Sequence, residues 1–113
     1  MYSKILGPLD GSKTAENVLP LARSFARALQ IPVELLAVID IVEMTHQVAR
    51  DRVAIFKSLI NDATGRFTEY LEGIAQNFPT GTTRCTIQTG SAAEAIINSA
   101  ASDKRTLIAL ATH

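Results

Sequence analysis

Hydrophobic and polar residues along the chain group into short apolar segments separated by longer periodic ones. Four short segments are rich in apolar and β-branched residues and are flanked by turn residues, which predicts strands. They cover residues 4–9, 33–39, 84–88 and 106–111. Three longer segments carry an apolar residue every three or four positions, which predicts amphipathic helices. They cover residues 12–29, 48–78 and 91–101.

Local signals refine the first and third helices. Ser12 is expected to be an N-cap, and Pro20 removes a backbone hydrogen bond inside the first helix, which predicts a kink near Asn17. Ser91 and Glu94 have the spacing of a capping box, in which each side chain accepts a hydrogen bond from the backbone N–H of the other residue. The first and third helices are therefore expected to begin just after Ser12 and Ser91.

Strands and helices alternate from the first predicted strand to the last, which favours a parallel sheet with right-handed crossovers. The sequence thus predicts a doubly wound α/β fold with helices on both faces of the sheet, in one domain spanning residues 1–113. Ligands of such sheets bind beyond the carboxyl ends of the strands, where the strand order reverses. Function is therefore expected in four loops, at residues 8–12, 38–41, 89–92 and 111–113.

Charge and composition exclude several classes of function. Eleven basic residues balance eleven acidic ones along the chain, so no surface for nucleic acid or an anionic membrane is expected. The apolar runs are far shorter than the roughly 20 residues that span a bilayer, and the N-terminus lacks a signal-peptide pattern. Cys85 is the sole cysteine, which excludes an internal disulfide, and is interpreted as a small buried hydrophobe. We therefore expect a cytoplasmic protein.

No set of residues has the pattern of a catalytic or metal centre. Ser12 has no histidine near it in sequence and no G-x-S-x-G motif around it, so it is not interpreted as a nucleophile. His46 and His113 are far apart and lack acidic residues at ligand spacing, so no metal is assigned to them. The chain is not expected to be an enzyme, although weak ATPase activity is left open.

Four segments, in order, resemble the universal stress protein family along the whole chain. Residues 5–12 are an apolar strand that ends in Pro-x-Asp-x-Ser. The other three are residues 35–40, 90–97 and 107–113. The ordered set is more specific than any one of its members.

The resemblance implies an ATP site, with magnesium, between the first and fourth strands. Asp10 would meet the ribose or help to hold the metal, Val38 would offer backbone groups to adenine, and Leu110 with Ala111 would line the opposite wall. The remaining site residues implied at these strand ends are Pro8, Leu9, Thr112 and His113. From the residues alone, Asp10 before Gly11 is more simply an ordinary turn residue that bonds its own backbone.

The chain also departs from the family pattern. The family places a Gly-x-x-Gly segment and a later Gly-Ser after the Thr112-His113 pair, for the phosphates, and these are not among the 113 residues. The domain is therefore expected to be incomplete at its C-terminus, without a last helix and a fifth strand that commonly forms a homodimer. Ala111 stands where the family usually has glycine, so its methyl group narrows the pocket, and Gly7 replaces a bulky apolar residue.

Two functions follow from the resemblance. The first is a regulatory module that binds ATP or a related nucleotide, with little or no catalysis. The alternative is a stress protein that binds no nucleotide and acts through dimerisation, which Ala111 favours. A nucleotide-activating enzyme would need a glycine and serine-rich loop after the first strand, and a phospho-receiver domain would need an aspartate where Thr89-Gly90 stands, so both are set aside.

Overall fold

Four parallel strands form one sheet in the order β3-β2-β1-β4. The computed structural model describes residues 2–40, 53–78 and 83–110. The strands are β1 (Lys4–Leu9), β2 (Val33–Ile39), β3 (Thr83–Thr89) and β4 (Thr106–Ile108). β1 and β2 have the predicted bounds, whereas β3 extends one residue further at each end and β4 is shorter than predicted.

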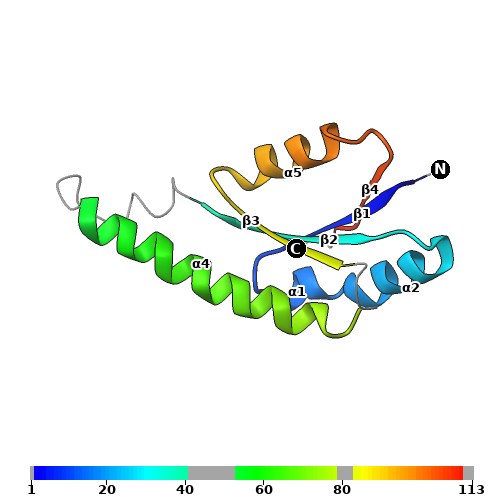
Figure 1. Ribbon diagram of the computed structural model, residues 1–113, viewed down its shortest axis with the longest axis horizontal. Helices are drawn as coiled ribbons and strands as arrows, with labels where there is room; N and C mark the ends of the chain where they lie inside the picture. Colours follow the sequence, from blue (N-terminus) through cyan, green and yellow to red (C-terminus); the bar gives the residue numbers. More distant parts are fainter. Residues whose placement is uncertain (1, 41–52, 79–82, 111–113) are drawn as a thin grey trace.

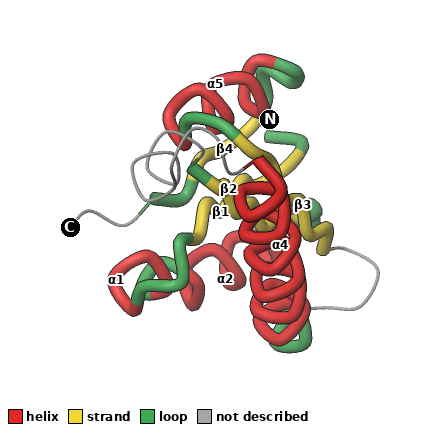
Figure 2. Tube along the Cα trace, turned by 90° about the vertical axis from the view of Figure 1, so that its left-hand side faces the viewer, coloured by secondary structure: helices red, strands yellow, loops and turns green. Residues whose placement is uncertain are grey.

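Helices cover both faces of the sheet, as predicted (Figure 1). Helices α1 (Lys13–Glu16), α2 (Leu19–Leu29) and α4 (Val53–Ala75) lie on one face, and of the described helices only α5 (Ala92–Ala101) lies on the other. Figure 2 shows the same arrangement end-on, with the strands between α5 and the other helices. The predicted residues 48–52 of the helix that becomes α4 lie outside the described residues. Among the described residues, no helix is long and apolar enough to cross a bilayer.

The predicted kink in the first helix is a complete break into α1 and α2. Because Pro20 has no N–H, it cannot donate to the carbonyl one turn earlier, and the helix ends there. The Asn17 N–H turns back to the Thr14 carbonyl at 3.2 Å, and a new helix begins with the bond from the Ala22 N–H to the Val18 carbonyl, 2.9 Å. Pro20 then occupies the first turn of α2, where a missing donor costs nothing.

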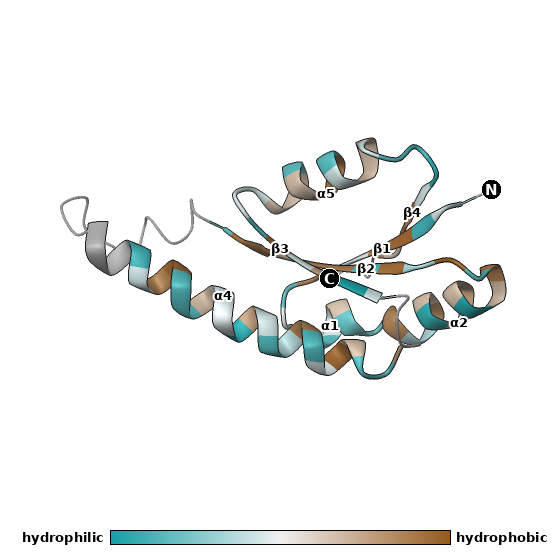
Figure 3. Cartoon of the chain, in the orientation of Figure 1, coloured by the Kyte–Doolittle hydropathy of each residue, from teal (hydrophilic) through white to brown (hydrophobic). Residues whose placement is uncertain are grey.

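The core lies between the sheet and the helices α1, α2 and α4. Ile5, Leu35 and Leu71 have no exposed surface and belong to one cluster. Colouring by hydropathy shows the apolar residues concentrated in β1 and β2 (Figure 3). Of the predicted stripe of α4, Leu71 belongs to this cluster and Phe67 and Ile74 pack against it, because an apolar stripe must be buried against a neighbouring layer.

Two side-chain predictions are wrong. Ser91 is the N-cap of α5, but its side chain makes no capping hydrogen bond, so the capping box does not form there. Cys85 is exposed rather than buried, because β3 is the edge strand of the sheet and has no strand beyond it among the described residues. Partial burial and the Glu72 carboxylate raise the pKa of the Cys85 thiol, which disfavours the reactive thiolate.

Candidate functional site

The strand order reverses between β1 and β4, and this is where a doubly wound sheet is expected to bind a ligand. Chain order runs outward from β1 through β2 to β3, and α5 then carries the chain back across the sheet to β4. In a doubly wound sheet the loops after two such strands diverge, and ligands bind in the crevice between them. The carboxyl ends of β1 and β4 are therefore the candidate site.

Pro8 ends the pairing of β1 with β4. The Ile5 N–H donates to the Pro32 carbonyl of β2, whereas the Leu6 carbonyl accepts from the Ala109 N–H beside β4. Odd positions of β1 thus bond to β2 and even positions bond to β4, as parallel ladders require. Pro8 is an even position, so its missing N–H falls on the β4 side. The pairing of β1 with β4 accordingly stops at Leu6 and Ile108.

Asp10 follows β1 directly and shapes the first loop of the site. Its carboxylate oxygen Oδ1 accepts a hydrogen bond from the Ser12 N–H at 2.8 Å, which is the turn that an aspartate makes with its own backbone. Gly11 between them has φ of +89°, a conformation that favours glycine. Ser12 Oγ then accepts from the Ala15 N–H at 3.1 Å, so the predicted N-cap of the first helix is confirmed. An ionised carboxylate has further acceptor positions beyond this bond.

Val38 lies at the same edge, one strand away. The β1–β2 pairing ends at Leu9 with Ala37, so Val38 is level with Asp10. The Pro32 carbonyl accepts from the Ile5 N–H of β1. Because backbone groups alternate along a strand, the even-numbered residues of β2, Val38 among them, direct their N–H and carbonyl groups toward β1. Its carbonyl lies past the last ladder pair, where a ligand at the end of β1 could reach it.

The other predicted site residues divide into three kinds. Leu9 is 4% exposed and belongs to the core, so only its backbone faces the crevice. Leu110 follows β4 and is 56% exposed, as an apolar wall requires. Ala111, Thr112 and His113 lie outside the described residues. Pro8, Leu9, Asp10, Val38 and Leu110 are thus brought to one edge of the sheet.

Tyr70 is a residue near this site that the sequence did not single out. It comes from α4, and its buried hydroxyl has no hydrogen-bond partner of normal geometry. Burial, followed by the interaction of the hydroxyl with the Glu16 carboxylate and then by the charge of Asp10, raises the pKa of Tyr70. Its position three residues after Phe67 in the apolar stripe indicated only a core residue.

No group of three or more metal-binding side chains occurs within residues 2–40, 53–78 and 83–110. The loop that follows β3, at residues 89–92, is held to the end of β2, because the Gly90 N–H donates to the Ile39 carbonyl at 2.9 Å.

Comparison with known proteins agrees with the architecture. No curated protein matches the chain by sequence. Hypothetical protein MJ0577, the subject of a structure-based assignment of biochemical function, superposes with a TM-score of 0.83 at 28% identity, over 100% of this chain and 76% of that one. The universal stress protein UspA from Lactobacillus plantarum superposes with a TM-score of 0.70 at 18% identity, over 95% of this chain and 76% of that one. Hypothetical protein PH0823 gives a TM-score of 0.63 at 26% identity, over 96% and 76% of the two chains.

The model of the universal stress protein family matches residues 1–113. The Pro-x-Asp-x-Ser end of β1 agrees with this family, and the likeness to UspA shows the same fold. The chain belongs to the universal stress protein family.

Proposed function

We propose that this protein is a cytoplasmic regulatory module that binds ATP or a related nucleotide, with magnesium, at the carboxyl ends of β1 and β4. The observation that carries the proposal is the end of the β1–β4 ladder at Pro8, beside Asp10. A parallel sheet that parts at its switch point exposes backbone groups and loop side chains to one ligand.

The residues at this edge suit the adenosine part of the nucleotide. The Val38 carbonyl, past the last ladder pair, would accept from the adenine amino group. The carboxylate of Asp10 would accept from the ribose hydroxyls or help to hold magnesium, and Leu110 would cover the base. Each contact needs only the group already present: a carbonyl acceptor, a carboxylate and an exposed apolar side chain.

Little or no catalysis is part of the proposal. Nucleotide hydrolysis requires a residue that positions water and charges that stabilise the transferring phosphate. Asp10 is the one titratable candidate among the proposed contacts in the described residues, and its Oδ1 already holds the turn to Ser12. The nucleotide would then act by ordering the loops after β1 and β4.

Calorimetric titration of ATP with magnesium, and separately of adenosine, into the 113-residue protein tests the proposal. Asp10→Asn is the informative variant, because asparagine keeps the turn with the Ser12 N–H but removes the charge. We expect it to weaken ATP binding by roughly 10- to 100-fold, the value of a charged hydrogen bond of about 1.5–3 kcal/mol. Asp62→Asn removes an exposed carboxylate of α4 and should leave affinity unchanged.

Absence of heat with both ligands would overturn the nucleotide proposal. The second candidate function, self-association without a nucleotide, is favoured by a separate observation. Several apolar side chains around the outer edge of β4 are exposed, among them Leu21 at 57% and Leu110 at 56%.

A further inference from the structure

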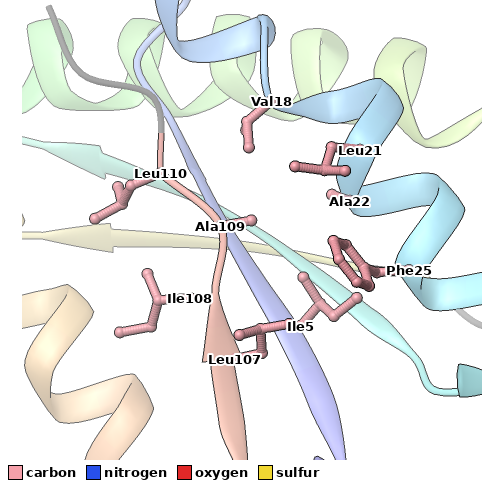
Figure 4. Close-up of a pocket in the computed structure, with 9 residues that line it drawn as sticks. All are labelled: Ile5, Val18, Leu21, Ala22, Phe25, Leu107, Ile108, Ala109 and Leu110. Carbon is pink, nitrogen blue, oxygen red and sulfur yellow. The ribbon is translucent and has the colours of Figure 1, made fainter.

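A cavity at the amino ends of the strands has the charged lining that the groove between α2 and β4 lacks. Only apolar residues line that groove (Figure 4), so it offers no charge to a polar ligand. The cavity has a volume of about 270 Å³ and lies between the first residues of β1, β2 and β3 and the loop that joins α5 to β4. Its charged lining residues are Lys4, Glu34, Arg84 and Asp103. It lies at the opposite end of the sheet from the candidate nucleotide site.

The strand register places Glu34 between two cations. Glu34 is paired with Leu6 of β1 on one side and with Arg84 of β3 on the other, and paired residues project from the same face of a sheet. Lys4 shares that face with Leu6, because residues two apart on a strand point the same way. Lys4, Glu34 and Arg84 therefore project together from three adjacent strands.

The carboxylate of Glu34 is already occupied. Its Oε1 accepts from the Lys4 ammonium at 2.8 Å, and its Oε2 accepts from the Thr86 hydroxyl at 2.9 Å. Arg84 stands opposite Glu34 in the register, yet within the part of the chain that the structure describes no carboxylate pairs with it. Arg84 is also exposed, so its guanidinium is accessible to a ligand.

The second carboxylate of the cavity, Asp103, is occupied in the same way. Its Oδ2 accepts from the Ser3 hydroxyl, and its Oδ1 accepts from the Arg105 N–H at 2.9 Å. Each carboxylate oxygen in the lining therefore already accepts a hydrogen bond from the protein. The hydrogen-bonding capacity that remains belongs mainly to the cations.

The balance of charge at the cavity is also positive. Its cations are Lys4 and Arg84, and Arg105 Nε lies next to it, 3.8 Å from Asp103 Oδ1. The carboxylates are those of Glu34 and Asp103, so one positive charge is in excess. An ammonium can donate beyond its bond to one carboxylate, and a guanidinium has a fork of N–H groups that matches two oxygens of one anion. These are the requirements of a site for an oxyanion.

We propose that this cavity binds a small oxyanion, the carboxylate or phosphate group of a metabolite with few carbon atoms, between Lys4 and Arg84. The Arg84 guanidinium would donate to two oxygens of the anion, and the Lys4 ammonium would donate a further bond while it keeps its pair with Glu34. Pro32 lines the same cavity and would contact the carbon atoms. The volume is below the roughly 300–1,000 Å³ of pockets for drug-sized ligands, so it suits a small acid better than a nucleotide. The site is separate from the end of β1 and does not depend on nucleotide binding there.

Nuclear magnetic resonance titration of the isotope-labelled 113-residue protein tests the proposal. Inorganic phosphate and succinate are the probes, each added at constant ionic strength, and adenosine is the uncharged comparison. We expect saturable shifts of the Arg84 side-chain N–H and the Lys4 amide with at least one anion, and no shift of these signals with adenosine. Saturation by one anion alone supports the site and identifies its oxyanion as phosphate or carboxylate. Shifts that do not saturate with either anion would overturn the site.

Arg84→Gln is the deciding variant, because it leaves both hydrogen bonds of the Glu34 carboxylate in place. We expect the dissociation constant of the anion to rise at least about tenfold, with an unchanged circular dichroism spectrum. Arg84→Lys keeps the charge but loses the fork, so it should weaken binding by an intermediate amount.

Arg27→Gln is the matched control. It removes the same charge from an exposed position on α2 outside the cavity and should leave the dissociation constant unchanged. Equal weakening by Arg84→Gln and Arg27→Gln would overturn the site, because the anion would then respond only to the net charge of the protein.

Discussion

The ammonium nitrogen of Lys4 lies 2.8 Å from Oε1 of Glu34, and this ion pair connects the neighbouring strands β1 and β2. Thr86 of β3 donates to the second carboxylate oxygen of Glu34 at 2.9 Å. One carboxylate therefore links β1, β2 and β3 near their amino ends. This network lies at the opposite end of the strands from the candidate nucleotide site and serves the sheet rather than that site.

Breaking this pair should destabilise the protein measurably. The side chains of Lys4 and Glu34 are 21% and 13% exposed. A double-mutant cycle with Lys4→Met and Glu34→Gln should give a coupling free energy of roughly 1–2 kcal/mol, between the values for exposed and buried pairs. Arg105 and Asp103, whose Nε and Oδ1 atoms lie 3.8 Å apart at the surface, provide the comparison and should couple more weakly, because solvent screens their charges. Equal coupling in both cycles, measured by urea unfolding, would contradict this account.

The free energy of unfolding should fall in mild acid because of the Glu34 carboxylate. Burial acts to raise the pKa of Glu34, but hydrogen bonds from Lys4 and Thr86 and the charges of Lys4 and Arg84 outweigh it and lower the pKa below 4.5. A carboxyl with a lower pKa in the folded state stabilises the fold above its unfolded pKa and loses this contribution as pH falls through the folded value. The free energy of unfolding should therefore decline below about pH 4.5.

The Glu34→Gln variant should show a shallower decline over the same range of pH. Asp103, whose pKa is lowered by hydrogen bonds from Ser3 and the Arg105 N–H, contributes in the same direction. Asp103→Asn is therefore measured alongside. An identical acid profile in wild type and Glu34→Gln would show that Glu34 is not a source of the dependence.

Tyr70→Phe should leave the protein as stable or stabilise it by about 1 kcal/mol. The Tyr70 hydroxyl is buried without a hydrogen-bond partner of normal geometry, and its removal ends a desolvation cost of roughly 1–3 kcal/mol. Tyr2→Phe removes an exposed hydroxyl and should change stability little. Thermal and urea unfolding provide the measurement, and a loss above about 1 kcal/mol in Tyr70→Phe would mean that the hydroxyl has a stabilising partner.

Two serines at helix starts should respond differently to alanine. Ser12 caps α1 with a 3.1 Å bond to the Ala15 N–H, whereas the Ser91 side chain makes no such bond to α5. Ser12→Ala should lower the free energy of unfolding by about 1 kcal/mol, and Ser91→Ala should change it by less than about 0.5 kcal/mol. The reverse order in chemical denaturation would refute the assignment.

Two glycines near the site make a similar matched pair. A methyl group at Gly7 would lie 3.6 Å from Leu35 Cδ2, an ordinary contact, so Gly7→Ala should be close to neutral. Gly11 has open space around it but a φ of +89°, so Gly11→Ala should cost about 1–2 kcal/mol. Because Gly11 follows Asp10, this variant should also weaken ATP binding, if the proposed site is correct. Equal stability of the two variants would contradict the strain argument.

The sequence by itself determined the elements whose residues are buried on both sides. The bounds of β1 and β2 follow from nearly continuous apolar runs, since a strand packed between two layers buries most side chains on both faces, and the two charges in these runs, Lys4 and Glu34, pair with each other. The sequence also predicted that Pro20 disturbs the first helix and that Ser12 caps it. Both effects are local, because a missing N–H and a hydroxyl act within one helical turn. The family likewise came from local patterns such as the Pro-x-Asp-x-Ser segment, and the family match confirms it.

Only the tertiary structure decided which groups meet and which edges stay open. Cys85 looked buried in its own segment, but the position of β3 at the edge exposes it. Tyr70 of α4 lies near enough to Glu16 and Asp10 for their carboxylates to raise its pKa, although 54 and 60 residues separate them along the chain. The consequence of Pro8 depended on which neighbour its missing N–H faced, and that neighbour, β4, is about a hundred residues away along the chain. Pairings between distant segments depend on strand order and register, which no local pattern encodes.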